Sequence, residues 1–591
     1  MSDDRMPADQ IETLWMPAFD PNNPKARFPG FNPREEILKA GSRKSAKSKP
    51  LPCGIIWKVD VPVRLRDGVI IYIDIFLPEH ALAAAKIPAI VAWSPYGKQG
   101  GLSALEDFPS RMGVKEETLS GYQKWEGPDP AYWCAKGYAV INPEARGAYS
   151  SEGDIQSFGE AEAKDAYDLI EWLAIQDWCN GKVGLAGNSW LAISQWFIAA
   201  SRPPHLAAIA PWEGFTDVYR HHAAVGGIPD VGFMESIFPF LAGNGRVENV
   251  PGMIKKYPLF NAYWDTKCAK VEDIEVPAYV VASWSNPLHT PGTFEGWSRL
   301  RGNDKWLRVH DSHEWYDFYN SQDDLARFFA KYLKGENNGW ESTPKIRLFL
   351  LNNGKKPRVE CMTLTQFPQD EAERVYIDDG FKTLSCAVPG QGAGGVFKLQ
   401  GNEQLKLRYE FKERTAVIGP IKICLHLSLE EGGDADVSVK ALPLDKNGRV
   451  KRYRTAPIKD LVGKAITNLL RLAGSPLHRH FFYDGSWGKL RVSHRSYDRN
   501  AGNAFTIAYT HQDPLFLKKD EIVKVDLMLT PMGLEFEAGE ALQFIITERD
   551  LSPMPIGKRK KTPAARNKGI KIFAAGKDGS YSRIDLPILR Q

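Results

Sequence analysis

The sequence predicts an α/β protein followed by a second domain built of β-strands. Between residues 51 and 344, apolar runs of strand length alternate with helical segments, which indicates a mostly parallel sheet with helices on both faces. After about residue 345 the apolar runs are short, have a period of about two residues and are separated by few helical patterns. The chain has 591 residues, whereas a single hydrophobic core stops growing at roughly 250–300 residues, so more than one core is required.

The individual strands of the first part are predicted from apolar runs that end in turn residues. A run buried on both faces, as in a parallel sheet, is continuously apolar. These runs lie at residues 55–65, 69–78, 87–97, 138–147, 182–189, 206–214, 277–286 and 305–313. Helices are predicted between several of them, at 160–176 and 190–201, and a further segment at 327–340 closes the first domain.

Five segments follow from this pattern. They are an irregular N-terminal arm (1–50), the first part of the α/β core (51–217), an inserted cap (218–272), the second part of the core (273–344) and a C-terminal β jelly roll (345–591). The cap is predicted because glycine, proline and aromatic residues interrupt the strand–helix alternation there. The jelly roll is predicted from runs at 345–351, 405–411, 421–429, 435–444, 505–511, 522–529 and 541–548.

Composition argues against several classes of protein. Lysine and arginine number 76 and aspartate and glutamate 72, a net charge of +4, which is little basic bias for a nucleic-acid binder. The N-terminus lacks the apolar run of a signal peptide, and no continuous apolar stretch reaches membrane-helix length. The seven cysteines contain no C-x-x-C pair, so neither a disulfide framework nor a zinc site is expected. We therefore expect a cytoplasmic protein with neither nucleic-acid nor membrane partners; a homodimer is left open.

The strongest signal for chemistry is a serine between a strand and a helix. Ser189 follows Gly187 at the end of the run 182–189 and precedes the helical segment 190–201. A serine on such a sharp turn exposes its hydroxyl above the sheet edge, next to the backbone N–H of Trp190. Ser189 is therefore the candidate nucleophile; the alternative is that it merely caps the helix.

A nucleophilic serine needs a base, and His313 is the preferred candidate. In sheets of this type the acid and then the histidine follow the serine along the chain, each at a strand end. His313 follows the last predicted core strand, whereas His310 lies within the end of that strand and is expected to be packed. His289, in the preceding loop, is the second candidate.

The acid that would orient His313 is ambiguous. Asn286 stands where the strand 277–286 ends, and an asparagine supplies no negative charge to stabilise an imidazolium. Glu213, at the end of the preceding strand, could replace it, and Asp311 or Glu314 could help locally. Glu213 and Asn286 both remain candidates.

Aromatic residues surround the predicted catalytic loops. Tyr96 follows an early central strand, where its hydroxyl could join the Trp190 amide in an oxyanion hole. Four tryptophans lie beside predicted catalytic positions and are candidates for a substrate pocket, with core packing as the alternative: Trp93, Trp212, Trp284 and Trp315.

Several motifs together resemble the cocaine esterase-like branch of the Xaa-Pro dipeptidyl peptidase family, which includes α-amino acid ester hydrolases. Residues 95–98 resemble its P-Y-x-K loop, and Arg146-Gly147 with Ser151-Glu152-Gly153 its R-G-x-x-x-S-E-G turn. Residues 187–196 resemble G-x-S-Y-x-G-x-x-Q-W, and 328–339 resemble the F-F-x-x-x-L-K-G-x-x-N-G segment. Residues 488–495 and 538–542 resemble its jelly-roll signatures, so the correspondence extends over roughly residues 50–590.

The resemblance implies an α/β-hydrolase domain with an inserted helical cap, a jelly roll that helps wall the site, and acyl-enzyme chemistry on an ester or amide without a metal or organic cofactor. It assigns Ser189 as nucleophile, His313 as base, and Tyr96 with the Trp190 amide as oxyanion hole. The family's acid falls on Asn286, and Trp190 replaces the motif tyrosine. The leading hypothesis is a serine hydrolase of a small-molecule ester or amide. The rivals are acyl transfer, lactone or cyclisation/elimination chemistry in secondary metabolism, and a ligand-binding protein with an inactive hydrolase fold.

Overall fold

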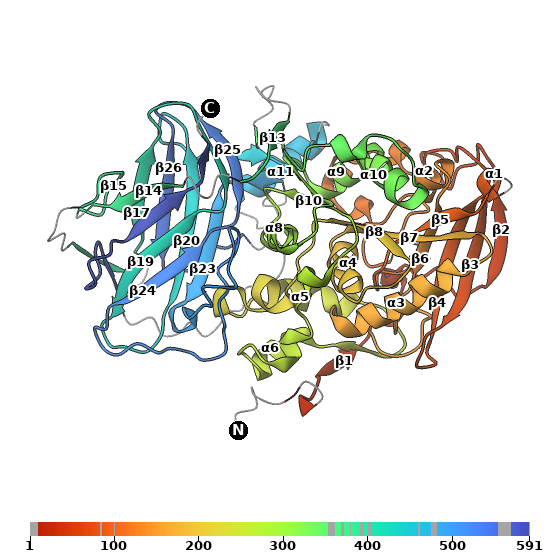
Figure 1. Ribbon diagram of the computed structural model, residues 1–591, viewed down its shortest axis with the longest axis horizontal. Helices are drawn as coiled ribbons and strands as arrows, with labels where there is room; N and C mark the ends of the chain where they lie inside the picture. Colours follow the sequence, from red (N-terminus) through yellow and green to blue (C-terminus); the bar gives the residue numbers. More distant parts are fainter. Residues whose placement is uncertain are drawn as a thin grey trace.

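The computed structural model consists of an α/β half and a β-rich half joined along a broad contact (Figure 1). It describes residue 7 and residues 10–82, 85–99, 101–352, 361–367, 372–378, 380–389, 395–399, 403–458, 461–473, 481–553 and 569–589. Helices α5 and α8 lie between the two halves in this view.

The α/β half is built on one sheet of eleven strands. Their order is β13-β12-β11-β10-β8-β7-β5-β6-β4-β3-β2. The strands β12, β11, β10, β8, β7, β5 and β6 run parallel to one another, whereas β13 at one end and β4, β3 and β2 at the other pair antiparallel. The bounds are β2 Arg34–Leu38, β3 Ile55–Arg64, β4 Ile70–Pro78, β5 Ile87–Val91, β6 Ala139–Pro143, β7 Cys179–Asn188, β8 Leu206–Trp212, β10 Ala278–Ser283, β11 Lys305–His310, β12 Ile346–Leu348 and β13 Met362–Leu364.

The helices of this half join and cover the parallel strands. Helix α4 is buried over almost its whole length, with Trp196 at 0% exposure, because it packs against β7 and β8 of the sheet and against α3. The bounds are α1 Glu79–Leu82, α2 Pro130–Ala135, α3 Glu160–Ala174, α4 Trp190–Ala200, α8 Thr290–Arg299, α9 Glu314–Asn320 and α10 Gln322–Lys334. The predicted alternation of strands and helices is therefore observed, with helix ends within a few residues of those expected.

Residues 218–272 form short helices between β8 and β10. They include α5 Gly232–Ile237, α6 Val250–Lys256 and α7 Ala262–Asp265, together with the short strand β9 Arg246–Glu248. Strand β9 pairs with β1, Trp15–Pro17, from the N-terminal arm. The arm was expected to be irregular, and this is wrong for two stretches: β1 binds the inserted segment, and β2 adds an edge strand to the main sheet.

The β-rich half consists of antiparallel sheets. One has the order β15-β14-β28-β19-β27-β16 with β24 added beside β19, and the others have the orders β17-β26-β20-β23 and β25-β18-β29. The bounds of these strands are β14 Glu373–Ile377, β15 Leu384–Ser385, β16 Val396–Leu399, β17 Leu405–Glu410, β18 Thr415–Gly419, β19 Lys422–Leu429, β20 Asp436–Leu444, β23 Ser486–Arg491, β24 Val523–Met528, β25 Met532–Phe536, β26 Ala541–Thr547, β27 Ile570–Phe573, β28 Arg583–Leu586 and β29 Ile588–Leu589. One helix, α11 Leu461–Leu472, interrupts them.

Two strand predictions for this half are wrong. The run at 345–351 was assigned to the C-terminal domain, but β12 pairs in parallel with β11 and therefore extends the catalytic sheet past residue 344. The run at 505–511 forms isolated bridges instead of a strand, for example between Tyr497 and Tyr509. A short apolar run does not specify its pairing partner, since partners are distant in the sequence.

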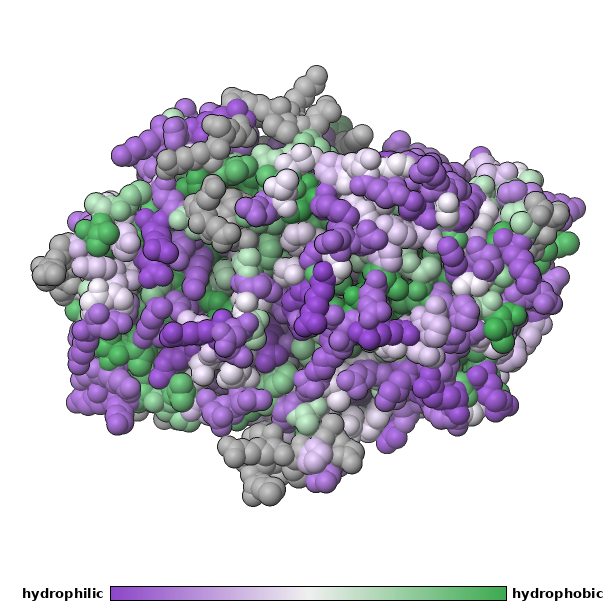
Figure 2. Space-filling view, in the orientation of Figure 1, coloured by the Kyte–Doolittle hydropathy of each residue, from purple (hydrophilic) through white to green (hydrophobic). Residues whose placement is uncertain are grey.

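Within the described part of the chain, no helix combines the length and apolar character needed to cross a bilayer. Polar and charged side chains cover most of the face seen in Figure 2, with smaller apolar areas between them.

Candidate active site

The turn that carries Ser189 has the strained backbone expected of a nucleophile. Ser189 lies between β7 and α4 with φ 55° and ψ −121°, and its amide donates to the Glu213 carbonyl at 3.0 Å. A non-glycine residue at positive φ costs energy and is typical of functional turns. The Ser189 side chain makes no helix-capping hydrogen bond, so the capping alternative is not what the structure shows.

Gly187 lets this turn form. Its φ is +141°, and a Cβ on it would lie 2.5 Å from the Leu191 side chain and 3.1 Å from the Glu126 carbonyl oxygen. A larger residue would push the turn away from both neighbours. Position 187 therefore requires glycine, because Leu191 and the Glu126 backbone lie too close to its Cα to leave room for a side chain.

Ser189 opens into a cavity of about 420 Å³. Its wall is largely aromatic and aliphatic, and it draws residues from every part of the chain: Lys25 and Arg27 of the arm, Phe233 and Phe240 of the inserted segment, and Thr455 of the β-rich half. Volumes of roughly 300–1,000 Å³ are usual for small-molecule sites.

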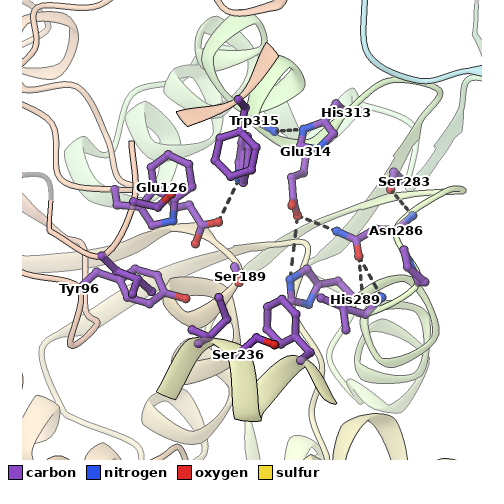
Figure 3. Close-up of a pocket in the computed structure, with 18 of the residues that line it drawn as sticks. Tyr96, Glu126, Ser189, Ser236, Ser283, Asn286, His289, His313, Glu314 and Trp315 are labelled. Atoms are coloured by element: carbon purple, nitrogen blue, oxygen red, sulfur yellow. Dashed lines mark hydrogen bonds and ion pairs between the residues drawn. The ribbon is translucent and has the colours of Figure 1, made fainter. Parts of the chain in front are cut away.

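Tyr96 lies beside the nucleophile as predicted. Its ring packs edge-on against Trp190, with centroids 5.8 Å apart, and its hydroxyl points toward Ser189 in Figure 3. Burial raises the pKa of Tyr96 well above its ordinary value and the Glu126 carboxylate adds to this, while contacts with the Ser189 hydroxyl and the Trp190 amide act in the opposite direction. The phenol therefore stays protonated and can donate to an oxyanion next to the Trp190 amide.

We expect Tyr96→Phe to lower kcat for ester hydrolysis about 10²–10³-fold with little change in KM, because a donor aimed at the oxyanion acts in the transition state. Steady-state kinetics with p-nitrophenyl esters measure both constants. Tyr149→Phe is the matched control: Tyr149 is also buried, but its hydroxyl donates to the Ala26 carbonyl at 3.0 Å. An equal loss in both variants would contradict the role of Tyr96.

His313 lines the cavity, as expected of a base, but its ring nitrogen is engaged. Nδ1 accepts the Trp315 backbone N–H at 3.3 Å, and the rings of the two residues lie 4.7 Å apart. In a catalytic triad the Nδ1–H of the histidine donates to the acid, so the contact with Trp315 is not the one that a triad base makes at that nitrogen.

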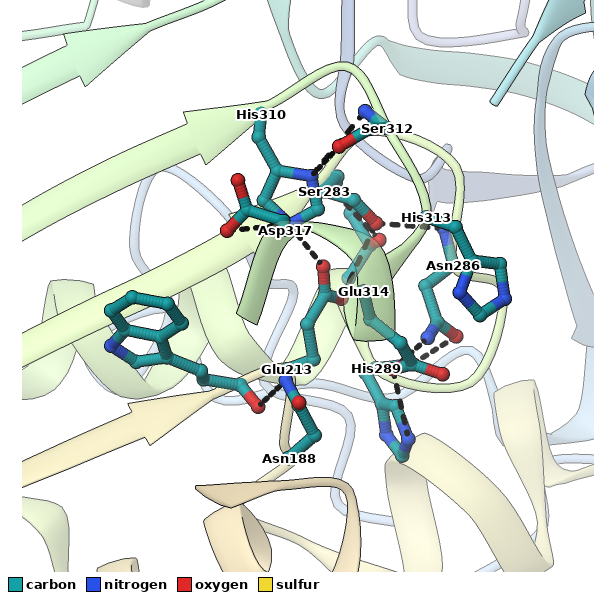
Figure 4. A network of polar contacts seen from close by, with 12 residues as sticks. Asn188, Glu213, Ser283, Asn286, His289, His310, Ser312, His313, Glu314 and Asp317 are labelled. Atoms are coloured by element: carbon teal, nitrogen blue, oxygen red, sulfur yellow. Dashed lines mark hydrogen bonds and ion pairs between the residues drawn. The ribbon is translucent and has the colours of Figure 1, made fainter. Parts of the chain in front are cut away.

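Glu213 does not serve His313 in this structure; it pairs with His310. Figure 4 shows the Glu213 carboxyl below the His310 ring, and Oε1 lies 2.9 Å from Nε2. Burial alone would lower the pKa of His310, but Asp317 and Glu213 outweigh it and raise that pKa. The expectation that Glu213 would orient His313 is thus corrected: its carboxyl meets the histidine that ends β11, which sequence reasoning treated as packed.

Asn286 uses its amide to order its own loop. The Oδ1 atom accepts the backbone N–H groups of Leu288 at 3.0 Å and His289 at 3.2 Å. The Nδ2 group donates to Glu314 at 2.8 Å (Figure 4). The Asn286 side chain therefore orders the loop after β10 and binds the Glu314 carboxyl. These contacts do not include the one with a histidine ring that the acid of a triad makes.

Three of the four predicted pocket tryptophans belong to the core. Trp93 donates to the buried Glu162 at 2.8 Å, Trp284 donates to the Phe349 carbonyl at 2.8 Å, and Trp212 is fully buried. Only Trp315 lines the cavity, where it is joined by Trp125, which no sequence pattern singled out. The alternative of core packing therefore holds for the other three, whose side chains are at most 2% exposed and do not line the cavity.

His289, the second candidate base, lines the same cavity in a neutral state. Burial lowers its pKa to about 3, and the neighbouring His222 adds to this shift. Its Nε2 lies 4.0 Å from Glu314, and its Nδ1 has no hydrogen-bond partner among the described residues. So low a pKa makes it a weak base.

Glu126 is the residue that sequence reasoning missed. It is 5% exposed, lines the cavity, and accepts the Trp315 indole N–H at 2.9 Å through Oε1 (Figure 3). Burial raises its pKa to about 8, although contacts with Trp315 and the Ser189 hydroxyl oppose the shift. Its loop carries no strand or helix pattern, so no sequence signal placed it beside Ser189.

Among the residues that the structure describes, no three histidine, cysteine, aspartate or glutamate side chains converge on a common point.

Both halves of the chain match known protein families. Residues 67–238 match the X-Pro dipeptidyl-peptidase (S15 family), and residues 338–563 match the X-Pro dipeptidyl-peptidase C-terminal non-catalytic domain. Cocaine esterase from Rhodococcus sp. (strain MB1 Bresler) is 32% identical over 161 residues, which are 27% of this chain and 24% of that protein. Xaa-Pro dipeptidyl-peptidase from Lactobacillus helveticus is 28% identical over 208 residues, 26% of this chain and 25% of that protein. The aligned segments thus span about a quarter of these curated relatives.

Solved structures match over nearly the whole chain. A CocE/NonD family hydrolase from Staphylococcus aureus has a TM-score of 0.81 and 28% identity, covering 95% of this chain and 98% of that one. An α-amino acid ester hydrolase has a TM-score of 0.63 at 15% identity, covering 93% and 98%, a similarity that concerns the fold alone.

Proposed function

We propose that this chain is a serine hydrolase that cleaves a small-molecule ester or amide through an acyl-enzyme on Ser189, because its two halves match the X-Pro dipeptidyl-peptidase (S15 family) and the X-Pro dipeptidyl-peptidase C-terminal non-catalytic domain. The observation that carries the proposal is the strained turn of Ser189 with the Tyr96 hydroxyl and the Trp190 amide beside it. A strained nucleophile next to two oxyanion donors is the arrangement that acyl transfer requires.

In the proposed reaction the Ser189 hydroxyl attacks the carbonyl carbon while a base takes its proton. The oxyanion receives hydrogen bonds from Tyr96 and Trp190, the leaving group departs, and water then releases the acid from the acyl-enzyme. His313 is the base that the sequence predicts, and it stays a prediction: its ring would have to present an unprotonated nitrogen to Ser189.

The cavity wall supports an apolar substrate. Phe108, Trp125, Phe233, Phe240 and Trp315 all line it. Aromatic walls bind apolar and aromatic groups through burial of area, so we propose an aromatic or otherwise apolar acyl part. We also propose that residues 218–272 act as a cap and that the β-rich half is a jelly roll that walls the site, since α5 and Thr455 both reach the cavity.

The second candidate function also proceeds through the acyl-enzyme, but a group other than water releases the acyl part. Asn286 occupies the position where the related family carries an acid, and the nearby carboxylate of Glu213 pairs with His310. If water is weakly activated, a hydroxyl or amine can attack the acyl-enzyme faster than water does. The product is then that of acyl transfer, lactone formation or cyclisation.

Labelling and product analysis together test the proposal. A fluorophosphonate probe should modify the protein once, at Ser189, as measured by intact mass and peptide mapping. Free acid from p-nitrophenyl and aryl ester substrates supports hydrolysis, whereas a product esterified to an added alcohol supports acyl transfer. Absence of labelling at Ser189 would contradict both candidates.

A further inference from the structure

A buried glutamate binds the nucleophile turn through its backbone. The Glu213 carbonyl accepts the Ser189 N–H at 3.0 Å, and the carbonyl of the preceding Trp212 accepts the Asn188 side-chain amide at 3.1 Å. Glu213 has a positive φ of 62° and Ser189 one of 55°, so this hydrogen bond joins two residues in a costly conformation. Such a conformation persists only where the surrounding structure holds it, and Glu213 therefore needs contacts that fix it.

The Glu213 side chain supplies these contacts. Its carboxyl is fully buried; Oε1 forms an ion pair with Nε2 of His310 at 2.9 Å, and Oε2 accepts the Ser283 hydroxyl at 3.3 Å (Figure 4). His310 is the last residue of β11 and Ser283 the last residue of β10, and both strands lie on the same side of β8 in the sheet. Glu213 thus connects the carboxyl ends of β8, β10 and β11 and, through its carbonyl, the turn after β7.

The His310 ring extends this connection to the loop of the predicted base. Its Nδ1 accepts the Ser312 N–H at 3.4 Å and lies 3.3 Å from the Ser312 hydroxyl. Ser312 directly precedes His313, which lines the cavity, whereas neither Glu213 nor His310 lines it. A continuous series of contacts therefore joins the turn of Ser189 to the loop of His313 from behind the cavity wall.

Stability alone gives little reason for a buried ion pair at this place. The cost of taking both charges out of water is often as large as the attraction between them, so such a pair adds little net stability. It does fix the relative position of the groups that it joins. That position matters for catalysis, because a displacement of about 1 Å at the reacting atoms can cost about 10²-fold in rate.

We propose that Glu213 and His310 are positioning residues that hold the Ser189 turn and the His313 loop at a fixed separation, a role that rests on the proposed acyl-enzyme function. Neither residue touches the substrate; each acts through the loop that it binds. Loss of either side chain lets the nucleophile and the predicted base move relative to each other. The cavity wall stays in place, so kcat falls while KM changes little.

The test is a double-variant cycle with p-nitrophenyl acetate. Glu213→Ala and His310→Ala should each lower kcat about 10²-fold, with KM within a few-fold of wild type. Because the two residues act as a unit, the double variant should lose no more than the weaker single variant does. Glu213→Gln gives up the charge but keeps an oxygen for His310, and its kcat should recover to within about ten-fold of wild type. If Glu213→Ala does not fold, the loss of kcat in folded His310→Ala decides.

Glu295→Ala is the matched control. Glu295 is also the partner of a histidine, 2.8 Å from Nε2 of His221, and both side chains are 9% exposed, but neither lines the cavity. Its kcat should stay within a few-fold of wild type. Unchanged kcat in Glu213→Ala or His310→Ala, an equal loss in Glu295→Ala, or single losses that multiply in the double variant would overturn the proposal.

Hydrogen exchange separates this role from the proposed function. The Ser189 amide donates to the Glu213 carbonyl, so the peptide that contains Ser189 should exchange faster in Glu213→Ala than in wild type or Glu295→Ala. Unchanged exchange in folded Glu213→Ala would also count against the positioning role. This readout needs no activity. If a fluorophosphonate fails to label Ser189 in the wild type, the acyl-enzyme function fails, and the exchange result still decides whether Glu213 holds the turn.

Discussion

Replacement of Ser189 by alanine is expected to lower kcat/KM for ester substrates roughly 10⁴–10⁶-fold. The acyl-enzyme needs an oxygen at this turn, and alanine offers none. The residual rate would come from the oxyanion donors and from binding, since Tyr96 and the Trp190 amide stay in place. Initial rates with p-nitrophenyl acetate and butyrate, together with loss of fluorophosphonate labelling, measure the effect.

Ser201→Ala is the matched control for this variant. Ser201 ends the same helix, α4, and its hydroxyl donates to the Ile198 carbonyl at 2.7 Å, away from the cavity. Its kcat/KM should stay within a few-fold of wild type. Full activity in Ser189→Ala would remove the serine from the mechanism and with it the proposed acyl-enzyme.

Replacement of Asp317 by alanine is expected to cost about 3–5 kcal/mol of the free energy of unfolding. Asp317 on α9 accepts two hydrogen bonds from Arg308 of β11, one of them at 2.8 Å, and both side chains are buried. Without the carboxylate the Arg308 guanidinium would remain buried and unpaired as a charge. Urea denaturation followed by fluorescence gives the change in midpoint.

The pH dependence of this contribution has a defined sign. Burial alone would raise the pKa of Asp317, but Arg308 and His310 outweigh it and hold that pKa below the ordinary carboxyl value. The stabilisation is therefore fully present above the unfolded pKa of about 4 and is lost as the pH falls through the lower folded value. The difference between wild type and Asp317→Ala should shrink below about pH 4.

Asp323→Ala is the control for the buried pair. Its side chain is 88% exposed and meets Lys136 at 3.3 Å, and exposed ion pairs contribute roughly 0–1 kcal/mol. If both variants lost a similar free energy of unfolding, the buried Arg308–Asp317 pair would stabilise the protein no more than an exposed ion pair does.

The order of elements in the catalytic half could be predicted from hydrophobic pattern. Continuous apolar runs marked β5, β7, β8, β10 and β11 because strands buried on both faces have no polar side. The turn between β7 and α4 singled out Ser189 for a local reason: strand, glycine, serine and helix follow one another within a few residues. The matches to the S15 and C-terminal domains confirm the family resemblance drawn from the same motifs.

Contacts between residues far apart in the chain could not be predicted in this way. Their positions at strand ends made both Glu213 and Asn286 candidates for the acid that orients His313. Only the tertiary structure shows that the Glu213 carboxyl meets His310 and that the Asn286 amide binds the backbone of its own loop. The same limit applies to Trp93, Trp212 and Trp284, because a large aromatic side chain next to a catalytic loop can face the core as readily as the cavity.

The sequence alone determined that the chain has an α/β half followed by a β-rich half, because the spacing of apolar residues is a local property of each strand and helix. The membership of the sheet at its edges was decided by tertiary structure: β2 comes from the arm and β12 from beyond the expected boundary, since edge strands pair with whichever partner lies beside them. The chemistry at Ser189 divides in the same way. A local pattern of strand, glycine, serine and helix identifies the nucleophile, whereas Glu126, 63 residues earlier in the chain, lines the same cavity through a loop whose position depends on the packing of the whole sheet.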